Sequence, residues 1–273
     1  MKWNEVDGFS GPYNRANEAQ KALYDPIIDS INLEFKERWP SMSREEKMRW
    51  KYQRYMQDYL GTIASVDDNV GRLLDYLEET GLDQNTMIIY TSDQGFYLGE
   101  HGWFDKRFIY DESFKTPLLI QWPGHIAPGS TNDEMVQNLD FAQTLLEVAD
   151  IKAPGDMQGE SLLPLLKGEA TWTREAVYYH YYEYPAVHMV KRHFGIVSKA
   201  YKLVHFYYDV DEWELYDRMK DPSELNNVYD DPAYASIVTQ LKLELKDMRI
   251  KYQDSEELDQ EFIEVYFDNG WVE

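Results

Sequence analysis

The residues best suited to chemistry lie within residues 90–106 of the chain. Asp93 and Gln94 follow the apolar, β-branched run 86–91, whose composition predicts a strand covered on both faces. Open α/β sheets place their functional groups just beyond such strand ends. Carboxylate and amide oxygens suit a hard cation such as Ca²⁺ or Mg²⁺ better than a soft metal. Asp93 and Gln94 are therefore candidate metal ligands.

Two basic residues follow in the same loop. The glycines between Gln94 and Lys106 allow the loop to fold the Lys106 side chain back over a bound anion. His101 stands between Gly99 and Gly102, which predicts a fixed turn. Its imidazole has the chemistry to contact an anion, to donate a proton to a leaving group or to hold the loop together, and these alternatives stay open.

The segment from this loop to Gly124 resembles the second signature of the type I sulfatases. The matching residues are Asp105-Lys106, Glu112-Ser113-Phe114-Lys115-Thr116-Pro117-Leu118-Leu119-Ile120 and Trp122-Pro123-Gly124. The amino-acid sequence of these segments is most similar to that of the bacterial N-acetylglucosamine-6-sulfatases, the mucin-desulfating branch. Residues 181–188 and 211–217 carry the same likeness. The similarity extends over most of the chain, from Trp50 to Arg249.

The resemblance implies an α/β fold, the C-terminal part of an alkaline-phosphatase-like sulfatase domain with a smaller antiparallel sheet-plus-helix subdomain. It implies hydrolysis of sulfate esters of glycans, with 6-O-sulfated N-acetylglucosamine as the expected substrate. It also implies Ca²⁺, held in part by Asp93 and Gln94, and a formylglycine nucleophile. Lys106 would stabilise charge on the transferring sulfuryl group. Family members of this kind are periplasmic or secreted, although no signal peptide is recognisable in this chain.

The chain departs from the family at the nucleophile. Formylglycine is made from the Cys or Ser of a Cys/Ser-x-Pro-x-Arg motif, and this sequence contains no cysteine. The serine segment Ser10-Gly11-Pro12-Tyr13-Asn14 lacks the arginine. The paired aspartates that complete the family's calcium site, expected ahead of that motif, are also missing. We therefore expect a sulfatase fragment with half of a calcium site, inactive alone and completed by the N-terminal half of a sulfatase.

Charge narrows the choice of partners. Lys and Arg number 27 against 50 Asp and Glu, a net charge of −23. A field of that sign repels nucleic acids and anionic membrane surfaces, so neither is expected as a partner. No apolar run is long enough for membrane insertion. A sulfated glycan would need a local basic pocket, for which the candidates are His101, Lys106, Arg107, Lys115, Lys191, Arg192 and His193.

A second polar group lies in the aromatic region near residue 185. His188 and Lys191 are candidate sugar-binding residues, because rings and polar groups of this kind bind sugar hydroxyls. Their polar neighbours are His180, Glu183 and Arg192. An ordinary β-hairpin with exposed polar side chains explains the same composition and stays open as an alternative.

The elements that must position these residues can be predicted from periodicity. Ser43 and Glu46 form a capping box that opens a long amphipathic helix ending before Gly81. Asp25-Pro26 predicts the start of an earlier helix. Strands are expected at 86–91, 117–122, 176–182, 193–198, 201–207 and 212–216, and helices near 140–148 and 232–251. We expect two domains, residues 1–168 and 169–273, with an acidic tail.

Two hypotheses of other classes remain. One is a non-catalytic remnant that binds sulfated glycans. The other is a metal-dependent phosphoesterase or phosphonate hydrolase of the same superfamily. Gln94 counts against the two-zinc phosphatases, where a histidine ligand is expected at such a position.

Overall fold

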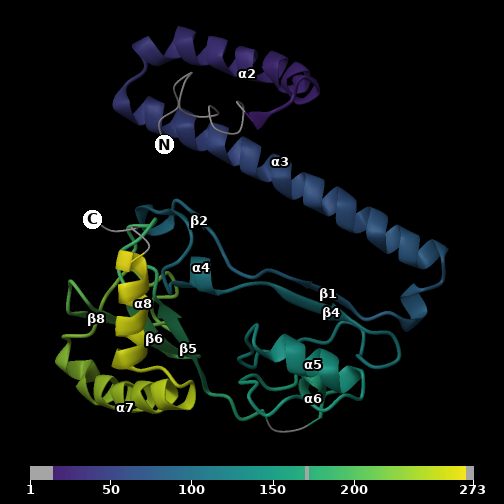
Figure 1. The fold of residues 1–273 in the computed structure, drawn as a ribbon. Coiled ribbons are helices and arrows are strands. Elements are labelled where there is room, and N and C mark those ends of the chain that lie inside the picture. The colour runs from purple at the N-terminus through teal and green to yellow at the C-terminus, as the bar shows by residue number, and fades with distance from the viewer. Residues whose placement is uncertain (1–14, 170–171, 269–273) are drawn as a thin grey trace. The chain divides into compact units, whose positions relative to one another are not determined.

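A computed structural model describes residues 15–169 and 172–268 of the chain (Figure 1). The chain divides into two compact units, Met1–Asp83 and Gln84–Glu273. The boundary expected between residues 168 and 169 falls inside the second unit, and that division stays a prediction. Among the described residues, none of the helices combines the length and the apolar character that crossing a bilayer requires.

The first unit contains two long helices, α2 (Glu18–Arg38) and α3 (Arg44–Glu79), joined by η1 (Trp39–Ser41). Asn17 and Gln20 form a capping box that starts α2, so the helix begins before the predicted Asp25-Pro26 position and Pro26 lies inside it. The capping box of Ser43 and Glu46 is confirmed at the start of α3. Gly81, with a φ of 69°, follows the helix end as predicted.

Aromatic side chains connect the two helices. The rings of Phe35 and Trp50 lie 5.4 Å apart, and Trp39 meets Trp50 edge-on at 6.5 Å. No described residue of either helix is buried, although α3 carries the predicted apolar stripe. Exposed members of that stripe include Ile63, Val66, Leu73 and Leu74.

The short helix η2 (Asp83–Asn85) spans the boundary between the units. It is followed by β1 (Ile88–Thr91), which pairs antiparallel with β4 (Leu118–Gln121). The sequence predicts a strand covered on both faces at 86–91, but neither β1 nor β4 contains a buried residue. Tyr90 is 43% exposed and Leu119 64% exposed. Within the described residues, the predicted cover on both faces of β1 is therefore wrong, because its residues are only half-buried or exposed.

The chain between these strands forms the loop that carries the candidate residues. It contains β2 (Tyr97–Leu98), η3 (Glu100–Gly102), β3 (Phe104–Asp105) and the single-turn helix α4 (Asp111–Phe114). Two further helices follow β4, namely α5 (Asp140–Val148) and α6 (Leu163–Leu166).

A four-stranded antiparallel sheet follows, with its strands in sequential order. Its strands are β5 (Ala176–Tyr181), β6 (His193–Ser198), β7 (Tyr201–Phe206) and β8 (Glu212–Asp217). The predicted strands are confirmed nearly residue for residue. After η4 (Pro232–Tyr234), α7 (Ala235–Lys251) lies beside this sheet, and α8 (Glu256–Asp268) occupies the segment predicted as an acidic tail.

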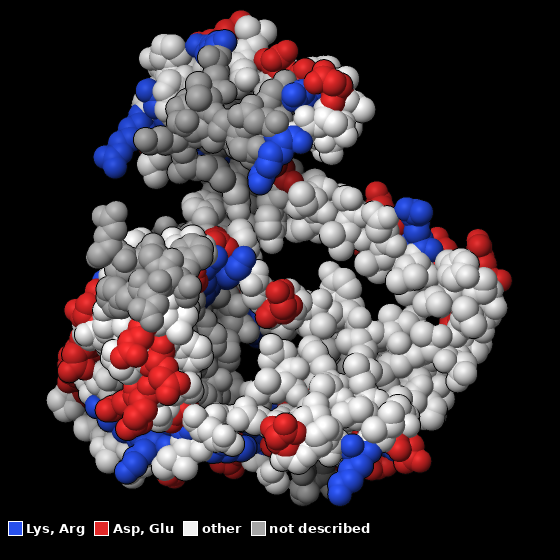
Figure 2. Space-filling model, viewed as in Figure 1, with Lys and Arg blue, Asp and Glu red and all other residues white. Residues whose placement is uncertain are grey.

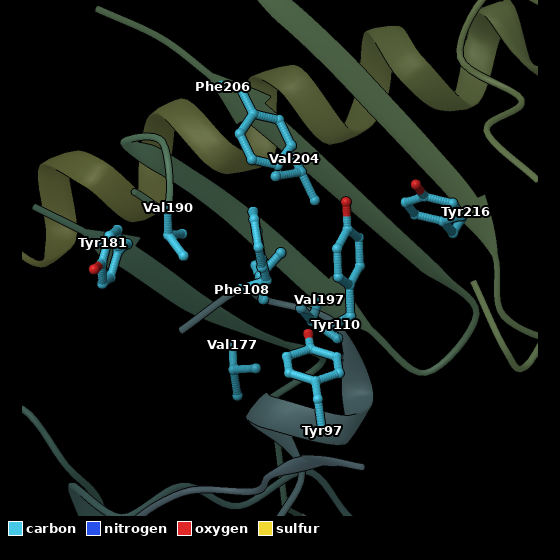
Figure 3. Close-up of a cluster of buried hydrophobic side chains, with 11 residues drawn as sticks. Tyr97, Phe108, Tyr110, Val177, Tyr181, Val190, Val197, Val204, Phe206 and Tyr216 are labelled. Carbon is cyan, nitrogen blue, oxygen red and sulfur yellow. The ribbon is translucent and has the colours of Figure 1, made fainter. Parts of the chain in front are cut away.

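The two faces of this sheet are covered differently. On one face, Leu241 and Leu245 of α7 pack on a cluster of strand residues, Ala176, Phe194, Ile196, Leu203 and Leu215. On the other face, Tyr97, Phe108, Ile109 and Tyr110 of the loop pack on side chains of all four strands (Figure 3). Because side chains alternate along a strand, the sheet presents one apolar surface to a helix and another to the loop.

Gly195 allows the loop to approach closely. A Cβ atom at this position would lie 2.6 Å from the Leu203 carbonyl oxygen and 2.8 Å from Ile109 Cδ1. Both distances are shorter than any ordinary carbon contact. The bare backbone of Gly195 therefore makes the space that the fully buried Ile109 side chain occupies.

The buried histidine of this core gives a first prediction. Burial lowers the pKa of His193, which is fully buried, to about 4. A histidine in the unfolded chain has a pKa of about 6.5. As the pH falls, the unfolded chain therefore takes up a proton before the folded chain does, and the folded state loses stability below about pH 6.5. We expect His193→Phe to reduce the loss of unfolding free energy between pH 7 and pH 5 by about 2 kcal/mol. Urea unfolding at both pH values measures the effect.

The control is His125→Phe, at an exposed position where the imidazole stacks on Trp122. It should keep the pH dependence of the parent chain. If His193→Phe and the parent lose equal stability over this range, the assignment to His193 is wrong.

Candidate functional site

The candidate lysine lies on a backbone held in an unusual conformation. Asp105 and Arg107, on either side of Lys106, have φ values of 84° and 109°. Such values are uncommon for residues other than glycine and require support from the surroundings. The Ser113 hydroxyl accepts a hydrogen bond from the Arg107 N–H at 2.8 Å, and the Tyr179 hydroxyl donates to the Arg107 carbonyl oxygen.

Arg107 is the centre of a cluster of polar side chains. Its guanidinium forms an ion pair with Asp105, and Nη2 lies 2.6 Å from His188 Nε2. Its Nε lies 3.7 Å from Glu183 Oε2. The sequence indicated Arg107 only as one of several basic candidates, and it gave no role to Asp105. Glu183 and His188 are far from Arg107 in the sequence, so only the folded chain brings them to it.

The orientation of the His188 ring follows from its neighbours. A guanidinium only donates hydrogen bonds, so His188 Nε2 must accept from Arg107. The other ring nitrogen, Nδ1, lies 2.6 Å from Glu183 Oε1 and donates to it. Glu183 Oε2 in turn accepts from the Tyr181 hydroxyl at 2.6 Å. The cluster is thus an ordered chain of donors and acceptors ending on a sheet residue.

Both carboxylates of the cluster are held in the ionised form. Partial burial opposes this at Asp105, but hydrogen bonds from Arg107 and Lys106 keep its pKa below the ordinary value. At Glu183 burial also opposes ionisation, while hydrogen bonds from Tyr181 and His188 lower the pKa. The cluster therefore combines fixed negative and positive charges at a partly exposed surface.

The other predicted basic residues are divided between this cluster and other places. Lys106 Nζ lies 3.2 Å from Asp105 Oδ1, with 32% of its side chain exposed, so Lys106 adjoins the cluster. Lys191 does not join it, because its amine binds Asp209 and the Tyr184 hydroxyl. Lys115 is exposed.

Two predicted pocket residues are internal. Arg192 and His193 are fully buried. Arg192 pairs with Asp259 of α8, and His193 Nδ1 donates to the Lys191 carbonyl oxygen at 2.8 Å. The sequence-based hypothesis of a basic pocket that included these two residues is wrong, because β6 begins here and both side chains point into the packed interior.

His101 contacts Tyr97, Tyr110 and Glu112 of the loop. Its ring stacks on Tyr110 with 4.6 Å between centroids, and its Nε2 lies 3.4 Å from Glu112 Oε2. The backbone has a φ of 52°, which agrees with the predicted fixed turn between the flanking glycines. Only 11% of the side chain is exposed. These contacts favour the loop-holding alternative, and its role as a substrate-binding residue stays a prediction.

Asp93 and Gln94 lie in the loop after β1. Asp93 is exposed and Gln94 is half-buried. The backbone carbonyl oxygen of Gln94 accepts a hydrogen bond from the Ser92 hydroxyl at 2.7 Å. Across the described parts of the chain, no three or more histidine, aspartate or glutamate side chains are arranged to hold a metal ion. Ca²⁺ takes roughly 6–8 oxygen ligands, so these two residues do not by themselves form a calcium site. Their assignment as ligands stays a prediction. The serine segment 10–14 lies outside the described residues.

Family profiles identify the class of protein. The sulfatase profile matches residues 13–151, and the profile of the C-terminal region of N-sulphoglucosamine sulphohydrolase matches residues 99–251. The chain belongs to the sulfatase family, whose members generally use Ca²⁺ and formylglycine. The second profile covers the whole cluster around Arg107.

Individual relatives show which kinds of sulfatase the chain resembles. An N-acetylglucosamine-6-O-sulfatase of Bacteroides thetaiotaomicron is 53% identical over 211 residues, which is 76% of this chain and 38% of that protein. The human N-acetylglucosamine-6-sulfatase is 41% identical over 121 residues, 42% of this chain and 22% of the human protein. The chain thus spans less than half the length of these curated relatives.

Solved structures confirm the predicted fold class. The structure of BT4656 in complex with its substrate D-glucosamine-2-N,6-O-disulfate superposes with a TM-score of 0.84 and 45% identity, covering 89% of this chain and 50% of that one. The phosphonate monoester hydrolase of Agrobacterium radiobacter superposes with a TM-score of 0.63 and 28% identity, covering 70% and 40%. The chain therefore has the C-terminal part of an alkaline-phosphatase-like sulfatase fold.

The cluster geometry predicts the tautomer of His188. We expect the Nδ1–H tautomer, because Arg107 donates to Nε2 and Nδ1 faces the Glu183 carboxylate. Long-range ¹H–¹⁵N NMR correlations distinguish this form from the Nε2–H tautomer. In Arg107→Met, the donor is lost and the proportion of the Nε2–H tautomer should rise.

His205 is the matched control, since its Nε2 lies 2.8 Å from the Asp211 carboxylate and should carry the proton in both proteins. An Nε2–H tautomer of His188 in the parent chain would show that the Arg107 contact is not formed in solution.

Proposed function

We propose that this chain forms the substrate-recognising portion of a sulfatase that hydrolyses 6-O-sulfate esters of N-acetylglucosamine in glycans. The observation that carries the proposal is the cluster of Asp105, Arg107, Glu183 and His188, with Lys106 beside it. The relatives support the substrate class: one is an N-acetylglucosamine-6-O-sulfatase, and BT4656 was solved with a 6-O-sulfated glucosamine as its substrate.

The cluster offers the groups that a sugar requires. Carboxylates accept hydrogen bonds from hydroxyls, and a guanidinium donates two in a fixed plane. The side chains of Asp105 and His188 are 41% and 36% exposed, so a ligand can reach them. Because each group is already oriented by a neighbour, binding requires little further ordering of side chains.

Lys106 supplies the cation suited to a sulfuryl group. Negative charge shifts toward the sulfuryl and leaving oxygens when the S–O bond breaks, and a fixed positive charge stabilises that shift. The Asp105 carboxylate, which also pairs with Arg107, lies 3.2 Å from the Lys106 amine. A bound sulfate ester would then compete with Asp105 for the ammonium group.

Hydrolysis requires more groups than this cluster contains. The chain has no cysteine, and its serine segment 10–14 lacks the arginine of the formylglycine motif. Among the described residues, no three or more histidine, aspartate or glutamate side chains are arranged to hold a metal ion. The apolar stripe of α3 is exposed, as expected of a surface that packs against further protein. We therefore propose that the N-terminal portion of a sulfatase supplies the nucleophile and completes the enzyme.

Ligand binding by the chain itself tests the recognition role. We expect N-acetylglucosamine-6-sulfate to bind, and Arg107→Ala to weaken that binding by about tenfold or more, because a charged hydrogen-bonding group is removed. Isothermal calorimetry or NMR titration measures the affinity.

The matched control is Lys115→Ala, which removes one positive charge from an exposed position after α4. It should leave the affinity unchanged. If both variants weaken binding equally, the loss is due to net charge and not to Arg107 itself. If the parent chain shows no binding in the titration, the isolated chain does not recognise this sugar.

Reconstitution tests the reaction. Alone, the chain should release no inorganic sulfate from N-acetylglucosamine-6-sulfate. Mixed with the N-terminal portion of a related sulfatase carrying formylglycine, it should become active, and Lys106→Ala should lower kcat by about 10²–10³. N-acetylglucosamine-6-phosphate, assayed in parallel, distinguishes a phosphoesterase, the activity class suggested by the likeness to the phosphonate monoester hydrolase. Faster hydrolysis of the phosphate would favour that class.

A further inference from the structure

The single-turn helix α4 contacts the candidate loop at three places, Gly95, His101 and Arg107. The Gly95 N–H donates to the Ser113 carbonyl oxygen at 2.7 Å, and the Ser113 hydroxyl accepts from the Arg107 N–H. The Glu112 carboxylate oxygen Oε2 lies 3.4 Å from His101 Nε2. The backbone approach is so close that a Cβ at Gly95 would lie 2.0 Å from the Glu112 carbonyl oxygen. The position of α4 therefore fixes both the segment after β1 and the Lys106-Arg107 segment.

The first residue of α4 is held by buried charges from the sheet and the segments after it. Lys202 of β7 is fully buried, and its Nζ lies 2.8 Å from Asp111 Oδ1 and 2.6 Å from Glu224 Oε1. Arg218 Nη2 lies 2.7 Å from Asp111 Oδ2. Glu224 is also buried, and its Oε2 accepts from the Asp111 N–H at 3.0 Å. Two cations and two carboxylates thus form a closed, balanced network.

The geometry of this network exceeds what stability alone requires. Burying charges costs desolvation energy, and well-packed apolar residues of similar volume often stabilise a protein equally well. Apolar contacts are not directional, however, whereas Asp111 is held by both oxygens and by its backbone N–H. The network therefore determines the register and direction of α4, which apolar packing leaves free.

We propose that Lys202 and Glu224 are positioning residues of the site, acting through Asp111 and α4 on the segments that carry Gln94 and Lys106. Neither residue touches the candidate cluster itself. The inference rests on the proposed function only for its effect on sugar binding, because its effect on the backbone can be measured without a ligand.

Amide hydrogen exchange in the full chain tests the proposal. In Lys202→Met/Glu224→Gln, which removes one charge of each sign, the amides of Gly95 and Arg107 should exchange at least about tenfold faster, whereas sheet amides such as Val204 should change much less. The affinity for N-acetylglucosamine-6-sulfate should fall in parallel.

The matched control is Arg174→Met/Asp140→Asn, which breaks another buried ion pair remote in sequence from α4. It should lower global stability without selective exchange at Gly95 and Arg107. Arg218→Leu, which loses one pair with Asp111 and leaves Lys202 in place, provides a milder variant if the double variant fails to fold.

The outcomes separate this inference from the proposed function. Selective exchange at Gly95 and Arg107 supports positioning even if no sugar binds to any variant. Exchange that increases equally at Val204, or that does not change at Gly95 and Arg107, overturns it. If the backbone loosens selectively while the parent binds no sulfated sugar, only the proposed function fails.

Discussion

The second unit depends on the packing of residues 108–110 against the sheet β5–β8. Phe108, Ile109 and Tyr110 are buried, and they follow Lys106-Arg107 directly in the chain. Burial of an apolar side chain of this size contributes about 1.5–3 kcal/mol. The charged residues of the loop are thereby fixed to the sheet by their immediate neighbours. A loop that covers a sheet face in this way is part of the core, so its chemistry-bearing residues cannot move independently of it.

The charge distribution makes local pairing necessary. With a net charge of −23, the chain repels anions at long range, and Figure 2 shows acidic side chains gathered around α8. The cations described above are mostly neutralised by carboxylates, Arg107 by Asp105 and Arg192 by Asp259. Under the proposed function, recognition of a sulfated sugar depends on short-range hydrogen bonds and on cations that exchange a carboxylate for a sulfate. This favours specificity over rapid electrostatic capture.

The local sequence predicted the strands β5–β8 and the capping box of α3, because alternation and capping depend on neighbouring residues. It also directed attention to Lys106 and His188. It could not predict that Arg107 joins His188, since the two are brought together only when the loop folds onto the sheet. Asp140 shows the same limit: the sequence predicts a helix near 140–148, but it does not indicate that the Asp140 carboxylate is buried against Arg174. Contacts between distant segments require tertiary structure, and charged residues in apolar surroundings give no local periodicity.

Three buried ion pairs in the second unit share one arrangement. Arg174 binds Asp140 of α5, Arg192 binds Asp259 of α8, and Lys202 binds Asp111 of α4. Each joins a cation in or next to a sheet strand to a carboxylate on a helix. A cation in a fixed position pairs with a carboxylate in only a few geometries, whereas two apolar surfaces can slide over each other. The sheet therefore specifies where each helix lies. Because α4 contacts the loop at Gly95 and Arg107, the same principle extends from the fold to the candidate site.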